Sequence, residues 1–82
     1  MKTIVYTSAA RRALRVHANR ADLILMKIEQ YAAAPEAQAN NVKKLRGRSD
    51  YRLRIGDFRI VFSETEDTMT IHGIGPRGGI YD

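Results

Sequence analysis

The architecture of this chain is set by residues 51–62, which read Tyr51-Arg52-Leu53-Arg54-Ile55-Gly56-Asp57-Phe58-Arg59-Ile60-Val61-Phe62. Apolar and charged residues alternate on both sides of Gly56-Asp57. Alternation with a period of two is typical of a strand with one buried face, and Gly-Asp is a common two-residue turn between paired strands. These residues are therefore predicted to form a β-hairpin.

The register of this hairpin sorts its side chains onto two faces. A two-residue turn places Ile55 opposite Phe58 and Arg54 opposite Arg59. The apolar face then consists of Tyr51, Leu53, Ile55, Phe58, Ile60 and Phe62, and the basic face of Arg52, Arg54, Arg59 and Val61. Like charges directly opposite each other destabilise a strand pair by about a few tenths of a kcal/mol. Because folding alone gives no reason for this arrangement, the basic face is predicted to bind an anion.

A strand and a helix are predicted at the start of the chain. Residues 3–6 are mainly β-branched or aromatic, which favours a strand. Thr7 or Ser8 can cap a helix over residues 9–18. The helical spacing of its apolar side gives a stripe of Ala10, Ala13, Leu14 and His17.

A second helix is predicted from a cap at Asn19 to about Ala34, since Pro35 disfavours helical geometry in the residue before it. Its main stripe consists of Ala21, Ile24, Leu25, Ile28 and Ala32. Leu23 and Met26 lie off this stripe. They are expected to pack against the first helix, and a site for a partner protein is the alternative.

The remaining elements are a loop, a turn and a last strand. Residues 35–41 are polar and rich in alanine, which predicts a loop. After the hairpin, a turn near residues 66–67 leads to a strand over 68–74, with Met69 and Ile71 on the core face. The sequence predicts a single domain spanning 1–82, because a chain of 82 residues supports one modest core.

Composition excludes several classes of protein. The chain has no cysteine, and its two histidines, His17 and His72, are isolated, so neither a disulfide framework nor a metal or other cofactor site is expected. No apolar run approaches the roughly 18 to 20 residues that span a bilayer, and residues 1–6 lack the apolar stretch of a secretory signal. A cytoplasmic protein without a membrane partner is expected.

The net charge of +5 is concentrated in residues 41–60. This quarter of the chain contains seven basic residues, namely Lys43, Lys44, Arg46, Arg48, Arg52, Arg54 and Arg59. Its acidic residues are Asp50 and Asp57, and elsewhere seven basic and seven acidic residues cancel. Such a run is either a solvated surface or a phosphate-binding patch, and the arginines of the hairpin favour RNA binding. The predicted pairing puts His72 beside Val61 on the basic face, where it is either a passive strand residue or a group that transfers protons.

The order of these elements, the hairpin and the C-terminal run Ile74-Gly75-Pro76-Arg77-Gly78-Gly79-Ile80-Tyr81 resemble the RelE/ParE toxin superfamily, and RelE-type toxins in particular. The resemblance covers nearly the whole chain. Its most specific parts are the hairpin and the arginine followed four residues later by tyrosine. It implies an α+β fold, the RelE-like microbial RNase fold, with an N-terminal strand, a two-helix hairpin and then an antiparallel sheet.

The resemblance also implies a function. RelE-type toxins belong to type II toxin-antitoxin systems, enter the ribosomal A site as endoribonucleases and cut messenger RNA without a cofactor. A cognate antitoxin wraps the toxin in a hetero-oligomer and inhibits it. By this resemblance Arg59 holds the scissile phosphate, Arg77 contacts the same phosphate, and Tyr81 takes part in proton transfer or base stacking.

The sequence departs from these relatives at three places. Arg52 and Arg54 stand where some relatives carry lysines proposed for acid-base steps, and Gly78-Gly79 replaces a charged pair before the terminal tyrosine. Because arginine does not lose its proton in proteins, Arg52 and Arg54 are expected to stabilise charge. Tyr81, His72 and Lys44 are the open candidates for the general base, and a slow enzyme that relies mainly on positioning and electrostatics is the alternative. Two other functions remain: inhibition of DNA gyrase as in ParE-type proteins, and a basic module that binds phosphates without catalysis.

Overall fold

The computed structural model describes residues 2–44 and 50–76, with the side chains of 38–40 excepted. Its elements follow the order β1 (Thr3–Tyr6), α1 (Ser8–Val16), α2 (Ala18–Ala33), the 3₁₀ helix η1 (Pro35–Asn41), β2 (Val42–Lys44), β3 (Tyr51–Ile55), β4 (Phe58–Glu64) and β5 (Thr68–Pro76). This is the expected α+β fold. None of the helices in the described ranges combines the length and apolar character needed to cross a bilayer.

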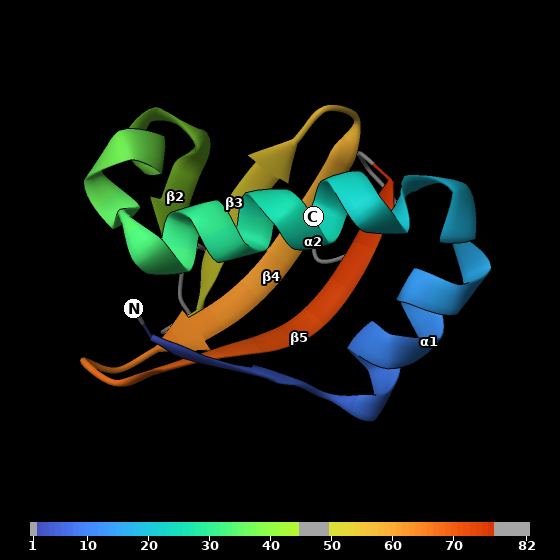
Figure 1. Ribbon diagram of the computed structural model, residues 1–82, viewed down its shortest axis with the longest axis horizontal. Helices are drawn as coiled ribbons and strands as arrows, with labels where there is room; N and C mark the ends of the chain where they lie inside the picture. The colour runs from blue at the N-terminus through green and yellow to red at the C-terminus, as the bar shows by residue number, and fades with distance from the viewer. Residues whose placement is uncertain (1, 45–49, 77–82) are drawn as a thin grey trace.

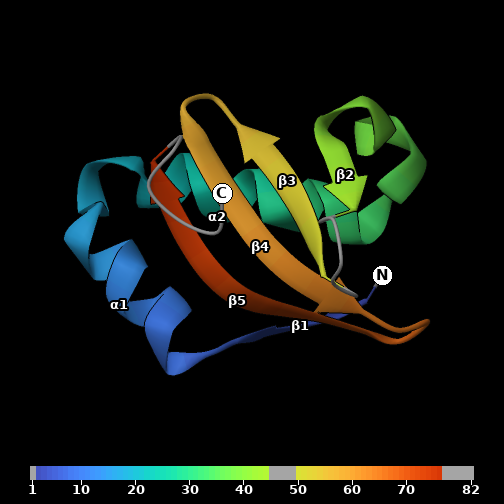
Figure 2. The ribbon, with the colours of Figure 1, turned by 180° about the vertical axis from the view of Figure 1, so that it is seen from behind.

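A five-stranded sheet with the order β1-β5-β4-β3-β2 forms the centre of the molecule. β1 is parallel to β5, and the other neighbouring strands are antiparallel. Figure 1 shows α2 crossing one face of the sheet and α1 lying beside β5. The opposite face is turned toward the viewer in Figure 2, and we call it the outer face.

The hydrophobic core lies between α2 and the sheet. Its fully buried large side chains from these two layers are Ile24, Ile28, Leu53, Ile60, Phe62, Met69 and Ile71. The expected stripe of α2 is confirmed at Ile24, Ile28 and Ala32, and Tyr31 is buried with them. This packing covers the apolar face of the predicted hairpin and leaves its arginines on the outer face.

The hairpin forms as predicted. Ile55 pairs with Phe58 and Arg54 pairs with Arg59 across β3 and β4. Gly56 in the turn has φ of 56°, a left-handed conformation that residues with a side chain rarely adopt. The turn residue therefore fixes the register that places the arginines opposite each other.

The ends of the two helices differ partly from expectation. Thr7 caps α1, because its Oγ1 accepts a hydrogen bond of 3.2 Å from the backbone N–H of Ala10. The predicted cap at Asn19 is wrong: α2 begins at Ala18, directly after His17, and His17 makes no capping hydrogen bond with its side chain. The chain turns at His17, whose ring packs edge-on against Phe58 with a centroid distance of 5.0 Å, so an aromatic contact marks this helix start.

Three further expectations are corrected. Residues 35–41 form a 3₁₀ helix where a loop was expected, and 42–44 form an additional edge strand, β2, where the sequence indicated only a basic segment. Pairing with β3 stabilises β2 despite the weak strand preference of lysine. Leu23 and Met26 remain 39% and 47% exposed, so the expected burial against α1 does not occur.

A β-bulge separates the two halves of the β4–β5 ladder. Val61 pairs with Gly73, but Phe62 pairs with Ile71, so β5 has one extra residue, His72. Val61 was expected to pair with His72, but it pairs with Gly73. The insertion lets Met69 and Ile71 on one side of the bulge and Ile74 on the other all reach the core.

Candidate nucleic-acid interface

Two rows of basic residues cross the outer face. Lys43 pairs with Arg52 across β2 and β3, and Arg52 pairs with Val61 of β4. In the adjacent row Arg54 pairs with Arg59. Because alternate residues of paired strands share a face, these four cations lie on one side of three neighbouring strands.

A small cavity of about 140 Å³ lies beside these rows and is lined by Asn41, Lys43, Arg52 and Arg54. Three of its four lining side chains carry positive charge and the fourth is an amide. Lys43 and Arg54 are exposed, whereas Arg52 is half-buried. A concave site with this lining is suited to the oxygen atoms of a phosphate group.

Arg59 lies deeper in the same face. It is half-buried and its Nε atom is shielded from solvent. On its β5 side it pairs with Gly75, and the next outward residue of β4, Val61, pairs with Gly73. These glycines add no side chains beside Arg59 and Val61, so β5 contributes no bulky group to this part of the face.

The outer face also contains a serine and a histidine in contact. The Oγ atom of Ser63 on β4 lies 2.8 Å from Nε2 of His72 on β5. The Oγ1 atom of Thr7 donates a hydrogen bond of 3.1 Å to the backbone carbonyl of His72. Sequence reasoning identified His72 as a candidate but missed Ser63; the change in spacing from Met69 and Ile71 to Ile74 was the signal for the bulge that brings them together.

Apart from His72, the predicted site residues divide into three groups. Arg52, Arg54, Arg59 and Lys43 are brought together on the outer face. Lys44 is exposed but pairs with Tyr51, so alternation places it on the opposite side from Lys43. The other candidates, namely Arg46, Arg48, Arg77 and Tyr81, lie outside the described residues. Within residues 2–44 and 50–76 no three His, Cys, Asp or Glu side chains gather as a metal site would require.

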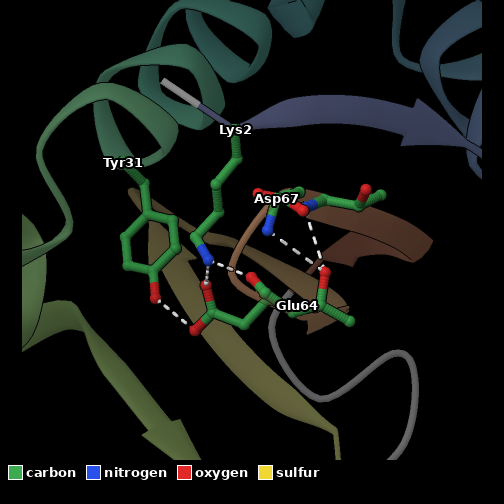
Figure 3. A network of polar contacts seen from close by, with 6 residues as sticks. Lys2, Tyr31, Glu64 and Asp67 are labelled. Atoms are coloured by element: carbon green, nitrogen blue, oxygen red, sulfur yellow. Dashed lines mark hydrogen bonds and ion pairs between the residues drawn. The ribbon is translucent and has the colours of Figure 1, made fainter.

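A polar cluster joins β1, α2 and the end of β4 near the β4–β5 turn (Figure 3). The Tyr31 hydroxyl donates a hydrogen bond of 2.8 Å to Oε1 of Glu64, and Lys2 Nζ lies 3.3 Å from Oε2 of the same carboxylate. Lys2 also donates to the backbone carbonyl of Thr65. Burial, reinforced by the hydrogen bond and the negative charge of Glu64, raises the pKa of Tyr31 well above its ordinary value. This cluster holds the first strand against elements from both halves of the chain.

A further depression, of about 630 Å³, lies along α1 and is lined by residues that include Arg12, Val16 and His17. It is open and mainly apolar, and Val16 is 70% exposed. None of its lining residues belongs to the rows of basic residues on the sheet. We therefore place the candidate interface on the outer face, where charge and concave shape coincide.

Comparison with known proteins identifies the fold. No protein-family profile and no curated protein matches the sequence. Among solved structures, RelE in the archaeal RelE-RelB complex from Pyrococcus horikoshii OT3 superposes with a TM-score of 0.76 at 22% identity, covering 96% of this chain and 98% of that one. The toxin-antitoxin complex RelBE2 from Mycobacterium tuberculosis gives 0.67 at 23% identity, with 93% and 98% covered. YafQ from E. coli gives 0.67 at 11% identity over the full length of both chains. The chain therefore has the RelE-like fold that its sequence resemblance implied.

Proposed function

We propose that this chain is the toxin of a type II toxin-antitoxin system and that it cleaves messenger RNA on the ribosome. The observation that carries the proposal is the pairing of Arg54 with Arg59 on the outer face, beside Arg52 and Lys43. Like charges on paired strands repel, so the pairing of Arg54 with Arg59 does not by itself stabilise the strand pair. A phosphate between them converts the repulsion into attraction.

The reaction proposed is an attack of the RNA 2′-hydroxyl on the adjacent phosphorus atom. It requires removal of the 2′-hydroxyl proton, stabilisation of the negative charge that develops on the phosphate oxygens, and protonation of the departing 5′-oxygen. Arginines provide the second requirement, since their planar guanidinium groups donate paired hydrogen bonds to phosphate. We assign this role to Arg59, with Arg52 and Arg54 beside it and, by resemblance, Arg77. The protein itself is proposed to hold no metal ion for this step, and by resemblance Tyr81 is a further candidate for proton transfer or stacking on a base.

The proposed partner is an antitoxin protein. Two of the similar structures are complexes, one named RelE-RelB and the other the toxin-antitoxin complex RelBE2. A chain with its whole net charge of +5 in residues 41–60 favours an acidic partner segment. We propose a hetero-oligomer in the cytoplasm in which the antitoxin covers the outer face and prevents contact with the ribosome and messenger RNA.

The internal attack predicts defined products. The upstream RNA fragment carries a 2′,3′-cyclic phosphate or the monophosphate formed when it opens, and the downstream fragment carries a 5′-hydroxyl. A message with one 2′-deoxy sugar at the cut position resists cleavage, while the same message with ribose there is cut on the same ribosomes. Normal cutting of the deoxy substrate would exclude the internal nucleophile.

Two alternatives have distinct outcomes in the same experiment. If no translated message is cut, a supercoiling assay with purified DNA gyrase tests whether the chain acts as a gyrase inhibitor. Binding to RNA that weakens steeply with salt, without cleavage or gyrase inhibition, identifies a binding module that acts through its charge alone.

A further inference from the structure

The first observation that carries a further inference is the position of His72 in the β-bulge. It is the extra residue of β5 between Ile71, which pairs with Phe62, and Gly73, which pairs with Val61. Bulges interrupt a ladder and re-aim a side chain, and they are over-represented beside active sites. The bulge therefore gives His72 an orientation that regular pairing does not provide.

Both the ring and the backbone of His72 are held in place. The ring is held by Ser63, whose Oγ lies 2.8 Å from Nε2. The backbone carbonyl is held by the Thr7 hydroxyl at 3.1 Å, and the same hydroxyl accepts from Ala10 N–H at 3.2 Å at the start of α1. His72 is thus fixed from β4 on one side and from the helix cap on the other.

The pair lies on the same face as the arginines. Ser63 follows Val61 by two residues and Arg59 by four on β4, so alternation places all three on the outer face. The strand spacings put the Cα atoms of His72 and Arg59 on the order of 10 Å apart. Both side chains are long enough to converge on one ribose-phosphate unit from this separation.

We propose that His72 accepts the 2′-hydroxyl proton and that Ser63 is the residue that positions its ring. This inference rests on the proposed ribonuclease function. The proposal requires the tautomer in which Nε2–H donates to Ser63 Oγ, so that Nδ1 is the unprotonated nitrogen that takes the proton. The 2′-oxygen then forms a bond to phosphorus, the bond from phosphorus to the 5′-oxygen breaks, and the 5′-oxygen takes a proton from water or from an acid at the site.

The other candidates for a base fit this step less well. Arginine stays protonated, which removes Arg52, Arg54 and Arg59. Lys44 lies on the side of the sheet that Tyr51 occupies, opposite the arginine rows. Lys43 lies on the outer face beside Arg52, but among side-chain types histidine is the one that ordinarily exchanges a proton between pH 5 and 8, which favours His72 as the base.

The contact itself is tested by NMR of the ¹⁵N-labelled imidazoles. The chain has only two histidines, so a His72→Gln sample assigns the spectrum. The wild type is expected to carry its proton on Nε2, and Ser63→Ala is expected to shift His72 toward a mixture of tautomers without changing His17. A wild-type proton on Nδ1, or a spectrum unchanged by Ser63→Ala, would overturn the positioning role.

The chemical role is tested by single-turnover cleavage on programmed ribosomes. His72→Gln keeps a polar side chain but cannot take up the proton, and it should slow cleavage about 100-fold or more with ribosome binding unchanged. Ser63→Ala should slow it in the same direction, and Ser63→Thr, which keeps the hydroxyl, should restore most of the rate. Thr70→Val is the matched control, because Thr70 pairs with Ser63 on the same face.

The outcomes separate this inference from the proposed function. Cleavage by the wild type that persists unchanged in folded His72→Gln overturns the role of His72 and leaves the ribonuclease proposal standing. A wild type that cuts no translated message overturns both. Circular dichroism of each variant identifies loss of structure, and equal slowing by Thr70→Val would show a general effect on the sheet and contradict the specific role of Ser63.

Discussion

Arg54 and Arg59 lie directly opposite each other across the β3–β4 ladder, on the face of the sheet that α2 leaves uncovered. Like charges opposite each other on paired strands repel, and in the proposed function a phosphate bound between them offsets this repulsion. The same residues should therefore lower stability in the free protein and favour binding.

Replacing Arg54 with threonine should stabilise the free protein. Arg54→Thr removes the repulsion and introduces a good strand former, so the free energy of unfolding should rise by about 0.2–1 kcal/mol. Arg54→Lys is the control that keeps the charge. Urea unfolding at low salt and at about 1 M salt measures the difference between the two variants, which should shrink at high salt because screening shortens the range of the repulsion. A threonine variant less stable than the lysine variant at low salt contradicts the explanation.

Removing Arg59 should abolish activity with little loss of structure. Arg59→Ala takes away the guanidinium that we propose binds the scissile phosphate, and loss of one such donor costs roughly 100- to 1,000-fold in rate. Arg11→Ala is the control, because it removes one positive charge from an exposed position on α1. This variant should cleave messenger RNA at the wild-type rate. By resemblance Arg77→Ala should behave as Arg59→Ala does. Equal cleavage by Arg59→Ala and the wild type, at equal concentrations of folded protein, would show that the phosphate role is misassigned.

Tyr31, which is buried, and Tyr6, which is half-buried, should respond differently to loss of their hydroxyl groups. Tyr31→Phe removes the hydrogen bond to Glu64 and should cost about 1 kcal/mol of unfolding free energy. The Tyr6 hydroxyl is buried without a hydrogen-bond partner among the described residues, so Tyr6→Phe should be neutral or stabilising. Thermal or urea unfolding of the two variants side by side gives the comparison, and a larger loss for Tyr6→Phe is the contrary result.

The protein should lose stability at alkaline pH. The raised pKa values of Tyr6 and Tyr31 determine the pH range in which this loss begins. Burial raises the pKa of Tyr31, with the Glu64 hydrogen bond adding to it, and burial followed by the charge of Glu29 raises the pKa of Tyr6. A raised pKa in the folded state stabilises the protein fully below the unfolded value of about 10, and this contribution is lost as the pH rises further. Unfolding free energy should fall above about pH 10, and less steeply for Tyr31→Phe than for the wild type. If the unfolding free energies of Tyr31→Phe and the wild type fall equally steeply with pH, groups other than Tyr31 cause the decline.

The hairpin turn should tolerate asparagine better than alanine. Gly56 has φ of 56° and open space around the position of a Cβ atom, so the cost of a side chain arises from the backbone alone. Gly56→Ala should lower stability by roughly 1 kcal/mol, and Gly56→Asn by less, because asparagine adopts this conformation more readily. Equal effects in denaturant unfolding would locate the constraint elsewhere.

The parts of the fold that the sequence predicts are those in which one local rule dominates. The alternation around Gly56-Asp57 determines the hairpin register, and the spacing of Ile24 and Ile28 determines the buried side of α2. β2 was not predicted because two of its three residues are lysines and its stability arises from pairing with β3. The helix start at His17 depends on packing against Phe58, a residue 41 positions later, which no local pattern reveals.

The candidate site was predicted in the same uneven way. The arginine rows follow from alternation, so their positions were available from the sequence. The contact between Ser63 and His72 depends on an inserted residue, and a period-two pattern assigns no partner to an insertion. Tyr31 and Glu64 are 33 positions apart on different kinds of element, and their hydrogen bond requires the assembled layers.

The parallel pairing of β1 with β5 has a consequence for synthesis of the protein. β1 precedes the other described elements in the chain, yet its pairs run from Thr3 with Thr68 to Tyr6 with Ile71, so each partner residue is made 65 positions after it. The ion pair between Lys2 and Glu64 likewise forms only after residue 64 has been made. The sheet cannot close on a partly made chain, and contacts of such long range also slow folding. A nascent copy can therefore pair β3 with β4 and align Arg54 with Arg59 before β5 is made, but the edge of the sheet formed by β1 stays open until β5 has been translated.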